Sequence, residues 1–104
     1  MKQPLTVKAL QQHIKAIDFQ PDKQYEVALK LFEEVGELSV EMRKAHQYGL
    51  SAKRKQAIMY ELYDVLHYVT HIANLYQIDL EEAIIEKDKI NAIRYHEREG
   101  LPHD

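Results

Sequence analysis

The chain contains no cysteine, so neither a disulfide bond nor a thiolate metal site can form. Its 104 residues include only 3 glycines and 3 prolines, too few for the many tight turns of an all-β fold. No apolar run approaches the roughly 18 residues of a membrane-spanning helix, so we expect no membrane partner. The amino-terminal residues Met1–Pro4 lack the apolar core of a secretion signal. These absences fit a protein of the reducing cytoplasm, which is the expected location.

The residues that are present favour a helical protein with a real core. Hydrophobic residues make up 45% of the chain, enough to exclude wholesale disorder. Leucine, alanine, glutamate, lysine, glutamine and isoleucine, which all favour helices, are abundant. The net charge of −3 argues against an extended nucleic-acid surface, but not against a small anionic ligand. We therefore expect residues 1–104 to form one all-α domain.

Apolar residues recur at helical spacing in four stretches, separated by short breaks, which predicts four helices. Their ends are marked by N-cap residues, by proline at a first helical position, and by glycine after a last turn. An aspartate and a glutamate before the fourth stretch have the spacing of a capping box. Short connections predict a four-helix bundle-like domain, up-and-down or a close relative. The expected boundary residues are Thr6, Asp18–Phe19, Pro21, Gly49, Ser51 and Asp79 with Glu82, and the tail from Gly100 is expected to fray.

Two acidic pairs stand at the edge of the predicted apolar stripes. Glu34 and Glu37 are three residues apart on the second helix, and so are Glu61 and Asp64 on the third, so each pair projects from one side of its helix. At about 100° per residue, Glu34 lies roughly 40° from Leu38 of the apolar stripe. Packing these two helices together would therefore bring the two acidic edges close to one another.

A single acid of this kind is usually an ordinary surface residue, but the joint arrangement is harder to explain in that way. Clustered carboxylates beside a core repel each other and lose hydration, so they persist when protonated, paired with cations or bound to metal. Few basic residues lie nearby, which favours metal. An all-carboxylate set suits a hard cation, Mg²⁺ first and Mn²⁺ as the alternative. Because Mg²⁺ commonly bridges to phosphates, a phosphorylated substrate is expected.

The ordered motifs resemble a known family. Glu33–Glu37 followed by Glu61–Asp64 resembles the EExxE…ExxD signature of MazG-like nucleoside triphosphate pyrophosphohydrolases. Ile78–Ala83 resembles the turn after the third helix of that family, and the similarity spans roughly residues 25 to 95. The carboxyl-terminal K…N..R segment of the family is matched by Lys87, Asn91 and Arg94.

The resemblance implies Mg²⁺-dependent cleavage between the α- and β-phosphates of a nucleoside triphosphate, and assembly as a homodimer or homotetramer. The metal ligands that it implies are Glu34, Glu37, Glu61 and Asp64. The catalytic acids that it implies are Glu33, Glu34 and Glu37, and the general base among them stays open. The substrate-binding residues that it implies are Lys87, Asn91 and Arg94.

Two departures from the family pattern keep a rival interpretation open. Tyr63 stands where the family often has a small residue, and Ile90 where it often has lysine. Either change could weaken the site, and the alternative is then a non-catalytic helical module that binds nucleotide or protein. A third interpretation, a zinc or di-iron site, uses His67 and His71, four residues apart. Because His67 lies about 120° from Glu61, away from the apolar stripe, a surface histidine is the favoured explanation.

Three further features have more than one explanation. Gly36 interrupts a helix at a cost of roughly 0.5–1 kcal/mol relative to alanine, which indicates either tolerance or a close approach of another helix. One or two of the 7 tyrosines could stack on a nucleobase, while the others pack in helix interfaces. The long second and third helices retain apolar faces that one small core cannot cover, so a second subunit is a plausible partner.

Overall fold

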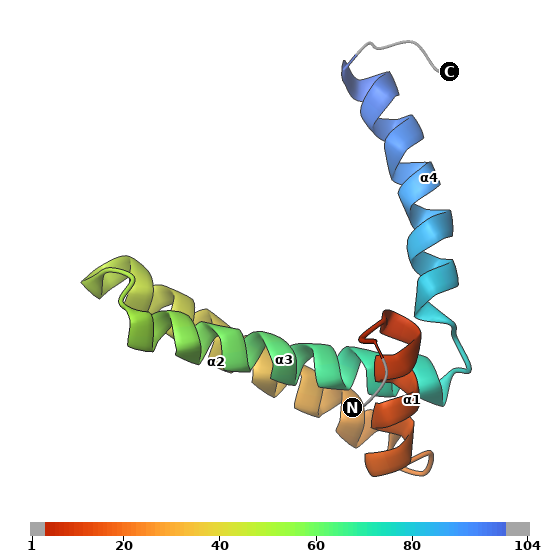
Figure 1. Cartoon of the computed structure of the whole chain (residues 1–104), viewed down its shortest axis with the longest axis horizontal. Coiled ribbons are helices and arrows are strands. Elements are labelled where there is room, and N and C mark those ends of the chain that lie inside the picture. The colour runs from red at the N-terminus through yellow and green to blue at the C-terminus, as the bar shows by residue number, and fades with distance from the viewer. Residues whose placement is uncertain (1–3, 100–104) are drawn as a thin grey trace.

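A computed structural model describes residues 4–99 of the chain (Figure 1). It contains four helices in the order α1, α2, α3 and α4, and no strand among the described residues. The all-α, four-helix prediction is confirmed, whereas the predicted fraying of the tail from Gly100 concerns residues outside the described part. The bounds are α1 Val7–Ile17, α2 Gln24–Tyr48, α3 Ala52–Leu75 and α4 Leu80–Glu99.

The helix ends follow local chemistry, with one correction. Thr6 Oγ1 accepts the N–H of Ala9 at 3.0 Å, and Ser51 Oγ accepts that of Arg54 at 3.1 Å, so both predicted N-caps are confirmed. The predicted start of the second helix at Pro21 is wrong, because α2 begins at Gln24. The Lys23 N–H donates to the Gln20 carbonyl at 3.0 Å, which closes a turn with Pro21 at its second position. The fixed φ of proline favours that position as much as the start of a helix.

Helices α2 and α3 run antiparallel as a long hairpin (Figure 1). Gly49 follows α2 with a φ of 89°, a conformation that glycine adopts without strain. The Arg54 guanidinium donates to the carbonyls of Tyr48 and Gly49 at 3.3 and 3.0 Å, which ties the turn to the first turn of α3. Arg54 thus satisfies carbonyl groups that the end of α2 leaves without helical partners.

The buried core lies at the opposite end of this hairpin, where α1 crosses α3. Its apolar members come from α1, the start of α2 and the end of α3, and are Ala9, Leu10, Ile14, Val27 and Ala73. Thr70 and His71 of α3 are fully buried beside them. The core therefore fixes α1 and one end of the hairpin, and leaves the rest of α2 and α3 as a two-helix arm.

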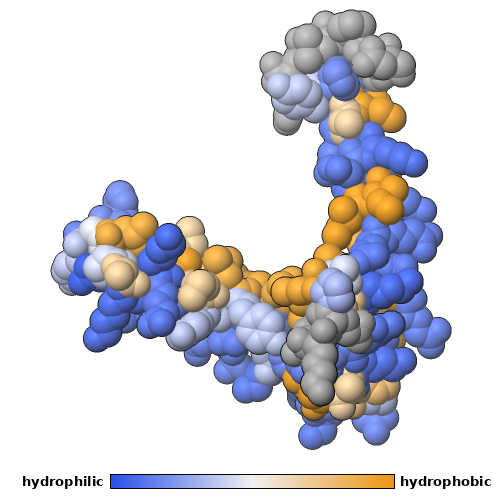
Figure 2. Space-filling view, viewed as in Figure 1, coloured by the Kyte–Doolittle hydropathy of each residue, from blue (hydrophilic) through white to orange (hydrophobic). Residues whose placement is uncertain are grey.

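Helix α4 leaves this core at an angle and contacts α1 near its base (Figure 1). The up-and-down arrangement therefore holds for α2 and α3, whereas α4 does not lie along them. Figure 2 shows hydrophobic residues gathered along the inner side of the angle between α4 and the hairpin. Phe32 of α2, Leu62 of α3 and Ile85 of α4 are more than half exposed. Among residues 4–99, no helix has the length and apolarity needed to cross a bilayer.

Candidate metal centre

Three carboxylates meet between α2 and α3. Glu34 comes from α2, and Glu61 and Asp64 come from α3, and one oxygen of each lies within 4.8 Å of the others. All three side chains are half-buried, because they lie at the edge of the surface along which the helices pack. We call Glu34, Glu61 and Asp64 the carboxylate cluster. The expected juxtaposition of the two acidic edges is therefore present in the fold.

The negative charges of the carboxylate cluster have no positive partner within the cluster, and they repel one another. Burial, the negative charge of Glu37, and the proximity of Glu61 and Asp64 raise the pKa of Glu34 to about 7. The pKa of Glu61 is raised as well, through burial and the charges of Glu37 and Asp64, although its contact with Glu34 opposes the shift. Atom Oε2 of Glu34 and Oε2 of Glu61 are buried without a hydrogen-bond partner among the described residues. Such a group either holds protons at neutral pH or binds a cation.

Of the two remaining acids of the first motif, only Glu37 lies beside the carboxylate cluster. Glu37 is exposed, yet it is close enough for its charge to raise the pKa of both Glu34 and Glu61. Glu33 is exposed and forms an ion pair with Lys30 at 3.3 Å. The structure therefore brings three of the four expected metal ligands together, with Glu37 one turn away along α2.

The three expected substrate-binding residues lie far from this arrangement within one chain. Lys87, Asn91 and Arg94 are exposed along α4, the helix that projects away from the hairpin (Figure 1). Their spacing places them on one face of α4, as predicted. A single chain thus separates its basic residues on α4 from its acidic pairs on α2 and α3.

A small pocket lies beside the carboxylate cluster. Its volume is about 230 Å³, and its lining comes from the loop before α2, the first turns of α2 and the middle of α3. Tyr68 lies one turn after Asp64, and Lys30 lies one turn before Glu34. The i, i+4 spacing from two acidic positions was a signal in the sequence that could have identified both residues. The lining residues are Gln20, Lys23, Glu26, Val27, Lys30 and Tyr68.

Tyr63, one of the two departures from the family pattern, does not point at the carboxylate cluster. It is displaced by about 160° from Glu61 around α3. Its ring lines a separate apolar pocket of about 480 Å³ against residues of α1, including Leu10 and His13. The bulky side chain therefore fills space between α1 and α3 and leaves the carboxylates open.

The expectation that His67 is a surface histidine is wrong, because its side chain is only 18% exposed. His67 Nε2 lies 2.8 Å and His71 Nδ1 3.4 Å from Oδ2 of Asp18, in the loop after α1, and His71 is fully buried. No pattern in the sequence indicated that the loop after α1 would place an acid on this side of α3. We call Asp18, His67 and His71 the histidine clamp.

The donor atoms of the histidine clamp lie close enough for a metal ion, but their protonation fits hydrogen bonds better. His71 Nε2 accepts the backbone N–H of Gln20 at 3.1 Å, so in a neutral imidazole the proton lies on Nδ1. That Nδ1–H lies 3.4 Å from the Asp18 carboxylate, without hydrogen-bond geometry, and offers no lone pair to a metal. Burial alone would raise the pKa of Asp18, but hydrogen bonds from His67 and Gln20 and the charges of both histidines lower it. The histidine clamp is therefore a structural tie between the loop and α3.

The carboxylate cluster fits a hard divalent cation. It offers only carboxylate oxygens, which suit Mg²⁺ or Mn²⁺ and do not suit soft thiolate-preferring metals. Two of these oxygens are buried and unpartnered among the described residues, so a cation would satisfy them at no cost in existing hydrogen bonds. The exposed rim at Glu37 leaves an open side through which a ligand can approach.

Comparison with known proteins agrees with this geometry. Residues 23–93 match the model of the MazG nucleotide pyrophosphohydrolase domain. The crystal structure of N-tagged iMazG from Vibrio DAT 722 is similar, with a TM-score of 0.73 and 36% identity over 88% of this chain and 98% of that chain. The C-tagged form of iMazG gives a TM-score of 0.71 and 36% identity, over 85% and 99% of the two chains. No curated protein sequence matches the chain. The family model covers the carboxylate cluster and most of α4, and the chain belongs to the MazG nucleotide pyrophosphohydrolase family.

Proposed function

We propose that the chain hydrolyses nucleoside triphosphates between the α- and β-phosphates, with Mg²⁺ held by Glu34, Glu37, Glu61 and Asp64. The products would be a nucleoside monophosphate and pyrophosphate, and the cellular role the removal of unwanted nucleotides. One observation carries the proposal: two helices bring three carboxylates within 4.8 Å, and two of their oxygens are buried without a partner among the described residues. A divalent cation, Mg²⁺ or alternatively Mn²⁺, relieves that repulsion and attracts a polyphosphate.

The proposed reaction needs a bound cation and a group that accepts the proton of the attacking water. Bound in the carboxylate cluster, the cation supplies charge neutralisation and a lowered pKa for a coordinated water. One of the three glutamates of the first motif accepts the proton of the attacking water. Glu33 and Glu37 are exposed, so water has access to both, while Glu34 belongs to the carboxylate cluster. The candidate proton acceptors are therefore Glu33, Glu34 and Glu37.

The pocket beside the carboxylate cluster suits the nucleobase end of the substrate. Its volume of about 230 Å³ is below the roughly 300–1,000 Å³ of pockets that enclose drug-sized ligands, so it would take a fragment such as one base. Tyr68 contributes an aromatic ring, and the floor includes the buried Val27. Gln20 and Glu26 provide polar groups for base edges. Lys30, between this pocket and Glu34, is placed to contact a phosphate.

A second subunit would complete the site, as a homodimer or a homotetramer. Exposed apolar residues line the inner side of the angle between α4 and the hairpin (Figure 2). Surface of that kind is commonly buried between subunits. Since α4 does not approach the carboxylate cluster of its own chain, we propose that Lys87, Asn91 and Arg94 meet the phosphates bound by another chain.

The first experiment is an assay of pyrophosphate release by the purified protein with Mg²⁺ and a panel of canonical and modified nucleoside triphosphates. We expect release with at least one of them, and its loss in Glu37→Gln and Asp64→Asn. Glu86→Gln is the matched control, because Glu86 is an exposed acid outside the carboxylate cluster. Circular dichroism verifies that each variant remains helical.

The rival, a non-catalytic module, gives a different result in the same experiment. It would bind metal and nucleotide, measured by calorimetry, without releasing pyrophosphate from any member of the panel. Release that persists in Asp64→Asn would instead mean that the reaction does not depend on the carboxylate cluster.

A further inference from the structure

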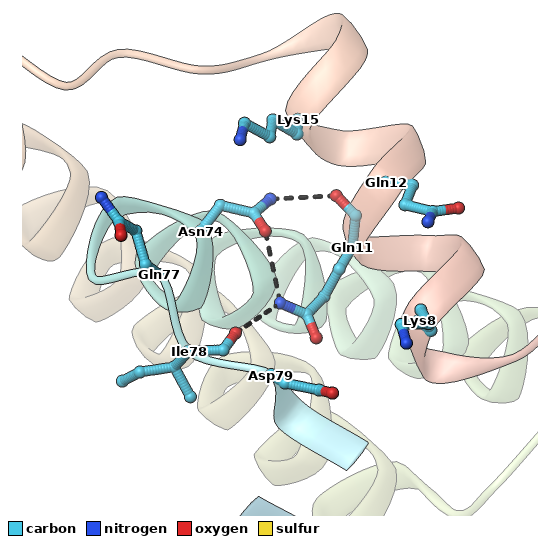
Figure 3. Close-up of a pocket in the computed structure, with 8 residues that line it drawn as sticks. All are labelled: Lys8, Gln11, Gln12, Lys15, Asn74, Gln77, Ile78 and Asp79. Atoms are coloured by element: carbon cyan, nitrogen blue, oxygen red, sulfur yellow. Dashed lines mark hydrogen bonds between the residues drawn. The ribbon is translucent and has the colours of Figure 1, made fainter. Parts of the chain in front are cut away.

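A buried glutamine joins three elements at the base of α4. Gln11 of α1 is 8% exposed, and its side chain makes three hydrogen bonds, of which Figure 3 draws those to Asn74 and Ile78. Its Nε2 donates to the Ile78 carbonyl at 2.8 Å and to Asn74 Oδ1 at 3.2 Å. Its Oε1 accepts the N–H of Leu80, the first residue of α4, at 2.8 Å. One side chain thus binds the end of α3, the connecting turn and the start of α4.

The surrounding groups reinforce the same junction. Asn74 Nδ2 donates back to the Gln11 carbonyl at 3.0 Å, which makes the α1–α3 contact reciprocal. The Lys8 N–H donates to Glu81 Oε2 at 2.9 Å, a second link from α1 to the first turn of α4. Asp79 Oδ1 accepts the Glu81 N–H at 3.0 Å and caps α4. Glu82, the predicted partner of Asp79 in a capping box, makes no hydrogen bond of this kind among the described residues.

Small changes at this junction become large displacements along α4. Arg94 is 14 residues beyond Leu80, roughly 21 Å at 1.5 Å per residue, so a tilt of about 10° would move it by roughly 4 Å. Within the chain, α4 packs against α1 near its base and lies away from the hairpin. The direction of α4 is therefore set by the few hydrogen bonds at its first turn.

We infer that Gln11 is a positioning residue: it fixes the direction of α4 and thereby places Lys87, Asn91 and Arg94 against the nucleotide phosphates. This inference rests on the proposed function of those three residues. Gln11 itself touches neither the carboxylate cluster nor the pocket beside Tyr68. It acts at a distance, through the rigid length of α4.

A neighbouring glutamine provides a matched control. Gln12 is exposed on the same helix, and Figure 3 shows its side chain directed away from Asn74 and Ile78. Its side chain makes no hydrogen bond with the described residues, although Gln11 and Gln12 both line a surface pocket of about 220 Å³ at this junction. Gln11→Met keeps the length of the side chain and removes its three hydrogen bonds, and Gln12→Met makes the same chemical change without that loss.

The kinetic test is a double-mutant cycle between Gln11→Met and Arg94→Ala. We expect Gln11→Met to lower kcat/KM by about a hundredfold, since displacements on the order of 1 Å can already cost about that much. We expect the double variant to have nearly the same kcat/KM as Gln11→Met alone. Arg94, once displaced, already contributes less to the reaction, so its removal costs little more. Mn²⁺ binding at the carboxylate cluster should stay unchanged. Fold losses that multiply in the double variant would overturn the inference, because they mean independent roles.

A second measurement does not depend on activity. Since the chain has no cysteine, Lys55→Cys and Ala92→Cys introduce two unique spin-label sites, one on α3 and one on α4. Labelled protein diluted with excess unlabelled protein reports the distance within one chain. We expect a narrow distance distribution for the parent and for Gln12→Met, and a broad or shifted one for Gln11→Met. An unchanged distribution in Gln11→Met would overturn the inference even if no nucleotide is hydrolysed, whereas missing activity with a broadened distribution would count against the proposed function alone.

Discussion

Two clusters of ionisable side chains lie one turn apart on α3, and their electrostatic states are opposite. In the histidine clamp, both histidines lie within 3.4 Å of the oppositely charged Asp18 carboxylate, and the pKa of Asp18 is lowered. In the carboxylate cluster, like charges face one another, and the pKa of Glu34 is raised to about 7. The first arrangement stabilises the fold as it stands. The second is stable only with a proton or a cation, and groups perturbed in this way concentrate at functional sites.

The largest expected difference between the two clusters is in activity. Asp64→Asn and Glu61→Gln should lower kcat/KM by more than the roughly 10–100-fold that the loss of an outer-shell partner costs, because they remove proposed metal ligands. Asp18→Asn, in the histidine clamp, should stay within about tenfold of the parent at a temperature where it is folded. Steady-state pyrophosphate release measures all three variants. Equal losses for Asp18→Asn and Asp64→Asn would abolish the functional distinction between the clusters.

The next largest difference is in stability, where we expect the larger loss for a variant of the histidine clamp. Asp18→Ala leaves the part-buried Nε2 of His67 without its partner, which lies 2.8 Å away in the parent, and this should cost about 1–3 kcal/mol. For a domain near 100 residues, each kcal/mol lowers Tm by about 4–8 °C. Thermal unfolding followed by circular dichroism measures the shift, with the exposed Asp22→Ala as control. A Tm for Asp18→Ala equal to that of Asp22→Ala would mean that the histidine clamp does not tie the loop to α3.

Stability as a function of pH should separate the clusters by sign. The pKa of Glu34 is higher in the folded, metal-free chain than in the unfolded one, so the folded state binds more protons between about pH 4.5 and 7. Stability should therefore fall as pH rises through that window. The lowered pKa of Asp18 acts in the opposite direction: its contribution is present above its ordinary value near 3.8 and is lost as pH falls below it.

Denaturant unfolding of metal-free protein between pH 3 and 8 tests these two slopes. In Glu34→Gln, the free energy of unfolding should fall less as pH rises towards neutral. In Asp18→Asn, it should fall less as pH is lowered into the acid range. Saturating Mg²⁺ should also remove the decline towards neutral pH, because a cation stabilises the ionised carboxylates. A decline that persists in Glu34→Gln would show that another group titrates there.

The sequence predicted features that depend on neighbours along the chain. The caps at Thr6 and Ser51 follow from single side chains, and the meeting of Glu34 with Glu61 follows from two helical periods and one tight turn. The histidine clamp was missed because Asp18 reaches His71 from a loop 53 residues away in sequence, which no helical pattern encodes. The direction of α4 was missed for the same reason, since Gln11 sets it across the α1–α4 junction.

The smallest expected effect concerns Gly36, which lies between Glu34 and Glu37 on α2. A Cβ atom added at Gly36 would meet no atom within 4 Å, so nothing in the described chain requires glycine there. If α2 stayed uncovered, Gly36→Ala would stabilise the protein by about 0.5–1 kcal/mol through helix propensity alone. If a second subunit packs closely against this turn, the added methyl group weakens assembly instead. Analytical ultracentrifugation with thermal unfolding separates the two outcomes, and Ser39→Ala on the exposed surface of α2 is the control. If Gly36→Ala is more stable and its assembly has the same mass as the parent, no second subunit packs closely against Gly36. If the variant instead sediments as smaller species, the subunit contact lies at Gly36, beside the carboxylate cluster.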